Sequence, residues 1–92
     1  MEITEVRIAP SDDKRIAAFA SIVLDDCFVV HGLRVQISKT GDYFLFMPGR
    51  KQADGNYIDI AFPLNSETRQ MLEEKVFAAY RIFADEPVKT RL

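Results

Sequence analysis

Short apolar runs separated by turn signals are the feature that most constrains how this chain can fold. Five segments have the length and composition of β-strands, namely residues 2–9, 15–24, 28–38, 43–47 and 57–62. Polar turn sequences separate them, at residues 11–13, 25–26, 39–42 and 54–55. Each of these connections is too short for the crossover that parallel strands require. We therefore expect an α+β fold in which residues 1–64 form a five-stranded antiparallel meander.

The turn at Asp25 and Asp26 predicts how the second and third strands pair. A two-residue turn there sets the pairs Leu24 with Cys27, Ile22 with Val29, and Ala20 with His31. The face that they share is apolar except for His31, and it continues through Leu33, Val35 and Ile37. The opposite face is also apolar, with Phe19, Val23, Phe28 and Val30. Both faces of this strand pair are therefore predicted to be apolar, and each would need other residues to shield it from water.

A single helix is predicted at residues 65–84. Asn65 or Ser66 can cap its first turn, Pro63 lies just upstream, and Glu67 suits the positive helix end. An apolar stripe recurs at three- and four-residue spacing, formed by Leu72, Val76, Ala79, Tyr80 and Phe83. Polar residues point the other way, at Glu67, Gln70, Glu74 and Arg81. Pro87 ends the pattern, so residues 85–92 are expected to fray.

One helix can cover one face of the sheet, which leaves the second apolar face exposed. Contiguous apolar surfaces of this kind usually mark association sites. The two edge strands of a meander also have unpaired backbone groups. We therefore expect a homodimer that forms through the sheet, with edges paired across a twofold axis.

Length and composition predict one cytoplasmic domain. The chain has 92 residues, of which 48% are hydrophobic, enough for a small core in a single domain over residues 1–92. The one cysteine, Cys27, excludes an intramolecular disulfide and is expected as a small buried hydrophobe in a reducing compartment. No export signal or membrane-spanning run is apparent in the sequence.

The charge balance counts against nucleic-acid binding but does not exclude it. The formal net charge is −2, from 12 cations and 14 acids. Cations are nevertheless concentrated locally, because residues 27–41 contain Arg34 and Lys39 and no acid, and residues 47–53 carry only positive charge. A local patch of this kind predicts modest, salt-dependent binding that duplication in an oligomer would strengthen.

The segment MPGRKQADGNYIDIAFPLNSETR, residues 47–69, is the candidate binding site. Pro48 ends the preceding strand, and the Asp54–Gly55 pair suits a two-residue hairpin turn that lifts Arg50 and Lys51 onto the rim of the sheet. Exposed cations there are expected to contact phosphates. Alternatively, they are gatekeeping charges, with Arg50 paired to Asp59 across the hairpin.

Arg69 is a second candidate, because it lies near the helix start where backbone donors also favour anions. Its structural alternative is a salt bridge to Glu73, four residues further along the helix. The scattered cations Lys14, Arg15, Arg34 and Lys39 would broaden a footprint, but such residues are usually only solvated.

The order of residues in this segment resembles the septation-protein SpoVG family. The resemblance rests on the order of elements along this segment: MP, a small residue, two cations, DG, an aromatic residue, DI, a P-hydrophobe-NS group and TR. It extends to residues 1–7 and 22–31. It implies a small bacterial cytoplasmic regulator of gene expression, septation and sporulation. Members bind DNA, and in some cases RNA, as dimers, with the cation pair at Arg50 and Lys51 in the binding role.

Three features of the sequence depart from the family pattern and bear on specificity. Phe62 stands where members usually have histidine, Ala53 where they usually have proline, and the order Arg50–Lys51 is often reversed. Only arginine presents a rigid donor fork, so the exchanged order is expected to change sequence preference.

Other residues suggest alternatives that the sequence favours less. Tyr43, Phe44, Phe46 and Tyr57 would suit a base-stacking platform, but such aromatics more often belong to a core or an interface. His31 is expected as a core or interface histidine, since His31 and Cys27 alone cannot complete a zinc tetrad and lie too far apart along a strand for a catalytic pair. No catalytic arrangement, cofactor motif or small-molecule substrate site is recognised. The alternative function is a protein-interaction adaptor, which suits the acidic balance and the two apolar faces.

Overall fold

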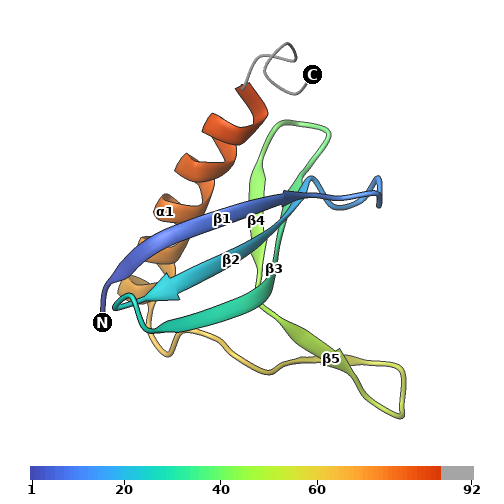
Figure 1. Cartoon of the computed structure of the whole chain (residues 1–92). Helices are drawn as coiled ribbons and strands as arrows, with labels where there is room; N and C mark the ends of the chain where they lie inside the picture. Colours follow the sequence, from blue (N-terminus) through green and yellow to red (C-terminus); the bar gives the residue numbers. More distant parts are fainter. Residues whose placement is uncertain (86–92) are drawn as a thin grey trace.

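A computed structural model describes residues 1–85, which form six strands and one helix (Figure 1). In chain order these are β1 (Ile3–Pro10), β2 (Ala18–Leu24), β3 (Phe28–Ile37), β4 (Tyr43–Phe46), β5 (Gly49–Lys51), β6 (Tyr57–Asp59) and α1 (Ser66–Asp85). The first four form one antiparallel sheet in the order β1-β2-β3-β4, and β5 pairs with β6 in a separate hairpin. The predicted α+β class and the meander are confirmed.

The prediction of a single five-stranded sheet is wrong. Pro48 has no backbone donor and stops the ladder after β4, so the chain leaves the sheet and starts a new strand at Gly49. This strand, which had been expected as part of the rim, pairs with the predicted fifth strand. The fifth strand is also shorter than the expected residues 57–62. Figure 1 shows the hairpin projecting from the end of β4.

The predicted pairing of β2 with β3 is also wrong. Asp25 and Asp26 do adopt positive φ, 50° and 55°, but Cys27 is an extra residue in the loop, so Leu24 pairs with Phe28. A second irregularity places His31 and Gly32 opposite Ser21, with Gly32 at a φ of +89°. A one-residue shift turns side chains to the other face of a strand. His31 and Cys27 are consequently exposed rather than buried.

The extra loop residue and the β-bulge also redistribute the apolar residues of β3. Leu33 and Val35 face the core as predicted, and Val30 joins them instead of lying on the opposite face. Val29 moves the other way and is exposed. Phe19 and Val23 lie on the face opposite the core, as predicted.

β2 begins three residues later than predicted because the preceding residues form a turn. The Ser11 hydroxyl accepts from the Asp13 amide at 3.0 Å, and the Asp13 carbonyl accepts from the Ile16 amide at 3.0 Å. Asp13 also forms an ion pair with Arg15 at 3.0 Å. These local bonds occupy backbone groups that a strand would have used.

The helix begins where the sequence predicts. Asn65 caps it, because its side-chain oxygen accepts from the Thr68 amide at 2.8 Å and its carbonyl accepts from the Arg69 amide. Leu72 and Val76 are buried against the sheet, and Phe77 and Tyr80 pack beside them. The predicted polar side of the helix, Glu67, Gln70, Glu74 and Arg81, is exposed. The prediction for residues 86–92 lies outside the described part of the chain.

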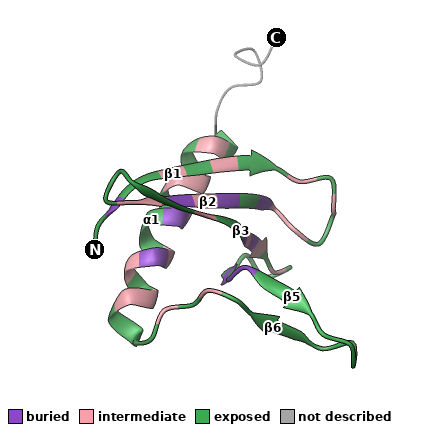
Figure 2. Ribbon diagram, turned by 60° about the horizontal axis from the view of Figure 1, so that its bottom comes forward, coloured by how far each residue is buried: buried purple, intermediate pink, exposed green. Residues whose placement is uncertain are grey.

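The core lies between the helix and one face of the four-stranded sheet (Figure 2). Its buried residues are Ile3, Ala20, Ile22, Leu33, Val35, Leu45, Met47, Leu72 and Val76. Tyr43 closes one end through edge-on ring contacts with Phe77, at 5.3 Å, and Tyr80, at 5.8 Å. The opposite side of the sheet, called the outer face below, is not covered by any other described element. In residues 1–85 no helix is long and apolar enough to cross a membrane.

Candidate nucleic-acid interface

The candidate site lies on the hairpin of residues 49–59, called the basic hairpin below, and its base is fixed to the core. Met47 and Pro48 are buried, and the Pro48 carbonyl accepts from the Ile60 amide at 2.8 Å. Every residue of the hairpin itself is exposed. The hairpin therefore has a rigid attachment and an open tip.

The tip is a three-residue turn rather than the predicted two-residue turn. The Gln52 carbonyl accepts from the Gly55 amide at 3.0 Å, and the Gln52 amide donates to the Asn56 carbonyl at 2.7 Å. Of the expected positive-φ pair only Gly55 has a positive φ, +92°. Asp54 instead accepts from the Asn56 amide through its side chain, at 3.0 Å. This is the common three-residue hairpin loop with glycine in the left-handed position.

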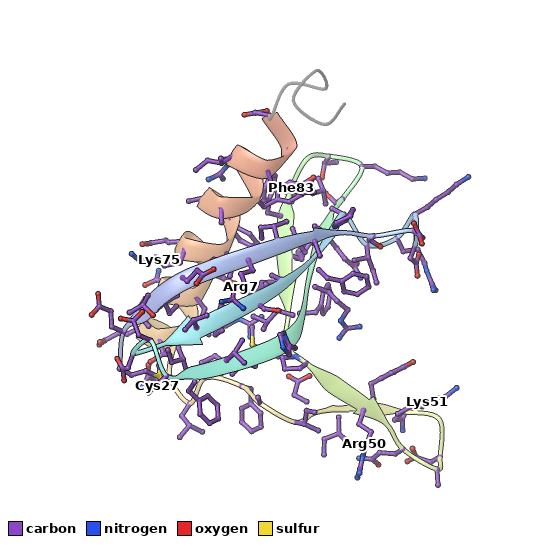
Figure 3. All side chains as sticks on the ribbon, viewed as in Figure 1. Arg7, Cys27, Arg50, Lys51, Lys75 and Phe83 are labelled. Carbon is purple, nitrogen blue, oxygen red and sulfur yellow. The ribbon has the colours of Figure 1, made fainter. Side chains whose placement is uncertain are left out.

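Arg50 and Lys51 project from opposite faces of the basic hairpin (Figure 3). They are consecutive in a strand, with Ile58 opposite Arg50 and Tyr57 opposite Lys51. Both are exposed, and neither has an ion-pair or hydrogen-bond partner among residues 1–85. The alternative pairing of Arg50 with Asp59 does not form, because Asp59 lies opposite Gly49. The hairpin thus presents one unneutralised cation on each face.

The side chain of Arg69 contacts β4 and its own helix, and within residues 1–85 it forms no hydrogen bond or ion pair with the basic hairpin. Its guanidinium donates to the Leu45 carbonyl at 2.8 Å and lies 3.4 Å from the Glu73 carboxylate. These contacts match the structural alternative and connect α1 to β4. A role for Arg69 in anion binding stays a prediction.

Of the scattered cations, Lys14, Arg15 and Lys39 are exposed and Arg34 is half-buried. The hydrogen bonds from the side chain and the backbone of Arg15 lower the pKa of the Asp13 carboxyl. The same side-chain bond raises the pKa of Arg15, to which Tyr57 of the basic hairpin adds a smaller electrostatic contribution. The loop before β2 and the basic hairpin therefore lie within electrostatic reach of each other.

The structure separates the four candidate stacking aromatics. Tyr43 packs against the helix through its ring contacts with Phe77 and Tyr80. The pKa of Tyr80 is raised, mainly by its burial and to a smaller extent by the electrostatic effect of Tyr43. Phe44, Phe46 and Tyr57 are exposed. Phe19 is open to solvent as well, although the sequence pattern indicated only that it belongs to an apolar face. Phe19 pairs with Arg34 because of the bulge at Gly32, and this pairing could not be inferred from the sequence.

His31 and Cys27 do not form a site. His31 lies on the outer face, with its Nδ1 2.6 Å from the Ser21 hydroxyl, so it is not a core histidine, and the alternative of an interface histidine stays a prediction. Cys27 is exposed at the β2–β3 turn, so its expected place in the core is wrong as well. No three histidine, cysteine or acidic residues within 1–85 are grouped so as to hold a metal ion.

The fold is that of a small α+β protein with an exposed basic hairpin beside a four-stranded antiparallel sheet. A family model described as SpoVG matches residues 1–82. Proteins named "Putative septation protein SpoVG" from Bdellovibrio bacteriovorus and Anaeromyxobacter sp. are 49% and 48% identical to this chain over 80 residues. These matches cover 87% of this chain in both cases, and 73% and 81% of the relatives. A protein of the same name from Phytoplasma australiense is 39% identical over 92 residues, 99% of this chain and 95% of the relative. The chain belongs to the SpoVG family.

Proposed function

We propose that this protein is a dimeric nucleic-acid-binding regulator that contacts DNA, and also RNA, through the basic hairpin. The observation that carries the proposal is that Arg50 and Lys51 are exposed and unneutralised within residues 1–85, in a chain of net charge −2. Unpaired cations on a projecting, fixed element are suited to phosphate contact. Control of gene expression and septation is proposed as the consequence of this binding.

The hairpin geometry supports contact with nucleic acid on both of its faces. A two-stranded β-ribbon is one of the elements that the major groove of B-DNA admits. With Arg50 on one face and Lys51 on the other, such a ribbon reaches phosphates or base edges on both sides. Arg50 is the proposed base reader, because its planar guanidinium can donate two parallel hydrogen bonds.

Dimerisation is proposed to combine two such hairpins, and an exposed apolar strip supports it. Ile60, Phe62 and Leu64 follow β6 at alternating positions, and Leu64 is 89% exposed. Phe62 lines a pocket of about 150 Å³ with Met1, Leu24, Val30 and Leu33. A second subunit that covered this strip would remove a large apolar surface from water. Pairing of the sheet edges across a twofold axis stays a prediction from the sequence.

A salt-dependent titration with two double variants tests the site. Replacement of Arg50 and Lys51 by alanine should weaken binding to duplex DNA, single-stranded DNA and RNA alike. It should also lower the slope of log affinity against log salt by about one unit for each phosphate that the protein no longer neutralises. The control is Lys75→Ala with Arg81→Ala, which removes the same two charge types from the exposed side of α1. Equal affinities for the two folded double variants would contradict the assignment.

The second candidate function is a protein-interaction adaptor, and the exposed Phe62 and Leu64 favour it. An adaptor predicts no measurable binding of any of the three nucleic acids at low salt. The same titration therefore separates the two functions before any variant is made.

A further inference from the structure

The outer face of the four-stranded sheet carries a row of aromatic side chains across its strands. Phe19 of β2 pairs with Arg34 of β3, which in turn pairs with Phe46 of β4. Phe44 lies two residues from Phe46 on the same face of β4. The rings remain 38%, 41% and 48% exposed at Phe19, Phe46 and Phe44. Rings anchored in strands with one face open to solvent are the usual platform for bases in sheet-based single-strand binders.

Arg34 lies in the middle of this row in a fixed position. Its guanidinium carbon is 5.6 Å from the centroid of the Phe46 ring, and one of its nitrogens donates to the Met47 carbonyl at 3.1 Å. A guanidinium held among aromatic rings can stack on a base as the rings do. Phe19, Arg34, Phe44 and Phe46 are called the aromatic platform below.

The charges beside the platform favour a polyanion over another protein surface. By strand alternation the ionised groups of the outer face are Glu5, Arg7 and Arg34, and Glu5 is paired with Arg7 at 2.7 Å. Arg34 therefore gives the platform a positive charge that no carboxylate of the sheet face neutralises. Around it the face is partly polar, with Ser21, His31 and Gln36. These groups supply hydrogen-bonding partners for base edges.

The basic hairpin adds cations near the platform. It leaves the end of β4 on the side of the sheet away from α1 (Figure 1) and begins at Gly49, two residues after Met47, whose carbonyl accepts from Arg34. Lys51, Tyr57 and Asp59 share one face of the hairpin, and Tyr57 lies within electrostatic reach of Arg15 in the loop before β2. Lys51 has no ion-pair partner among residues 1–85, so it is the cation proposed to meet the phosphates of a strand on the platform, whereas Arg15 is already paired with Asp13.

We propose that the aromatic platform binds unpaired bases of a single-stranded nucleic acid, with Phe44 and Phe46 stacking on successive bases. This inference rests on the proposed nucleic-acid function and specifies a ligand class for it, namely single strands. The Arg34 guanidinium stacks or donates to a base edge, and Lys51 contacts the backbone phosphates. Duplexes lack free base faces, so they engage the basic hairpin alone.

The test compares single-stranded and duplex oligonucleotides of one sequence by fluorescence anisotropy. Phe44→Leu with Phe46→Leu keeps apolar side chains and removes both rings. It should weaken single-strand binding by about tenfold or more, because each stacked base contributes roughly one such factor, and leave duplex affinity within about twofold. The matched control is Phe28→Leu, since Phe28 is exposed but lies on the core-side face of β3. It should change neither affinity.

The outcomes separate this inference from the proposed function. If the wild-type protein binds neither oligonucleotide, the proposed function fails. If alanines at Arg50 and Lys51 weaken both complexes while the Phe44 and Phe46 variant binds single strands normally, the platform is wrong and the proposed function stands. Light scattering supplies a further check. A change from dimer to monomer in the Phe44 and Phe46 variant would assign the outer face to a subunit interface and overturn the platform.

Discussion

At the residue scale, Gly49 shows how the absence of a side chain affects the position of the candidate site. It begins the basic hairpin immediately after Pro48, and a Cβ placed on it would lie 3.0 Å from the Ile58 carbonyl oxygen. A contact at this distance is tighter than nine in ten real Cβ contacts, so the β6 backbone would have to shift by a few tenths of an ångström. Glycine therefore permits the close approach of β5 to β6.

Gly49→Ala is expected to open the basic hairpin without unfolding the domain. The Gln52 and Ile60 amides donate across the hairpin, so their hydrogen exchange should accelerate, by about tenfold for each 1.4 kcal/mol by which local stability falls. Amides of β2 and β3 should keep their exchange rates. Residue-resolved hydrogen exchange by NMR measures both sets.

Gly41→Ala is the control for this prediction. Gly41 has a φ of +88° in the β3–β4 loop, with open space around the added Cβ. The strained backbone should lower the free energy of unfolding by about 1 kcal/mol and leave the relative exchange of Gln52 and Ile60 unchanged. Unchanged exchange at those two amides in Gly49→Ala would show that the hairpin does not depend on the glycine.

At the element scale, Arg69 connects the helix to the sheet. The hydrogen bond from its guanidinium to the Leu45 carbonyl satisfies a backbone acceptor on β4, which is an edge strand. The contact with Glu73 is partly exposed and is worth little by itself. The geometry therefore predicts that Arg69 contributes more to stability than Glu73 does.

Arg69→Ala is expected to lower the free energy of unfolding by about 1–2 kcal/mol, because it removes both the hydrogen bond and the weak ion pair. Glu73→Ala should cost less than about 0.5 kcal/mol, since Arg69 keeps its bond to Leu45. Urea denaturation of both variants gives the comparison. Equal destabilisation would show that the ion pair and not the bond to Leu45 carries the effect, and a stable Arg69→Ala protein whose nucleic-acid affinity falls as that of Arg50→Ala does would favour the anion-binding role instead.

At the scale of the whole molecule, two exposed surfaces compete to explain how copies of the chain associate. The apolar strip of Ile60, Phe62 and Leu64 lies beside the pocket lined by Met1 and Leu33. The outer face is more mixed, because Arg34, Ser21 and His31 lie among its aromatic rings. The proposed dimer therefore uses the strip and leaves the outer face free for nucleic acid.

Phe62→Ser with Leu64→Ser is expected to convert a dimer into a folded monomer, because the strip is exposed and removing it leaves the core residues in place. Light scattering at micromolar concentration measures the mass. The monomer should bind nucleic acid more weakly, since the paired hairpins no longer act together. A monomeric wild-type protein, or a double variant that remains dimeric, would contradict the use of the strip.

Much of the fold could be predicted because it depends on local signals. Turn residues located the strands of the meander, and Asn65 located the helix start through a bond to the Thr68 amide. The apolar spacing from Leu72 to Tyr80 identified the buried side of the helix. The exposure of Arg50 and Lys51 also followed from the sequence, since Pro48 ends the preceding strand and a turn follows at Gly55, although they were expected on the rim of the sheet and lie on a separate hairpin.

Pairing and orientation could not be predicted in the same way. The extra loop residue at Cys27 and the bulge at Gly32 each shift the β2–β3 register, and no local propensity distinguishes the resulting partners. That shift is what exposes His31 and places Arg34 between Phe19 and Phe46.

The sequence by itself determined the elements, the helix cap, the core stripe and the basic residues, because each depends on neighbours within a few positions of the chain. Only the tertiary structure decided that β5 and β6 form a hairpin separate from the main sheet, that Arg69 is bonded to Leu45, and that aromatic rings remain open on the outer face. These features arise from contacts between segments distant in sequence, whose register is fixed by the packing of the whole core.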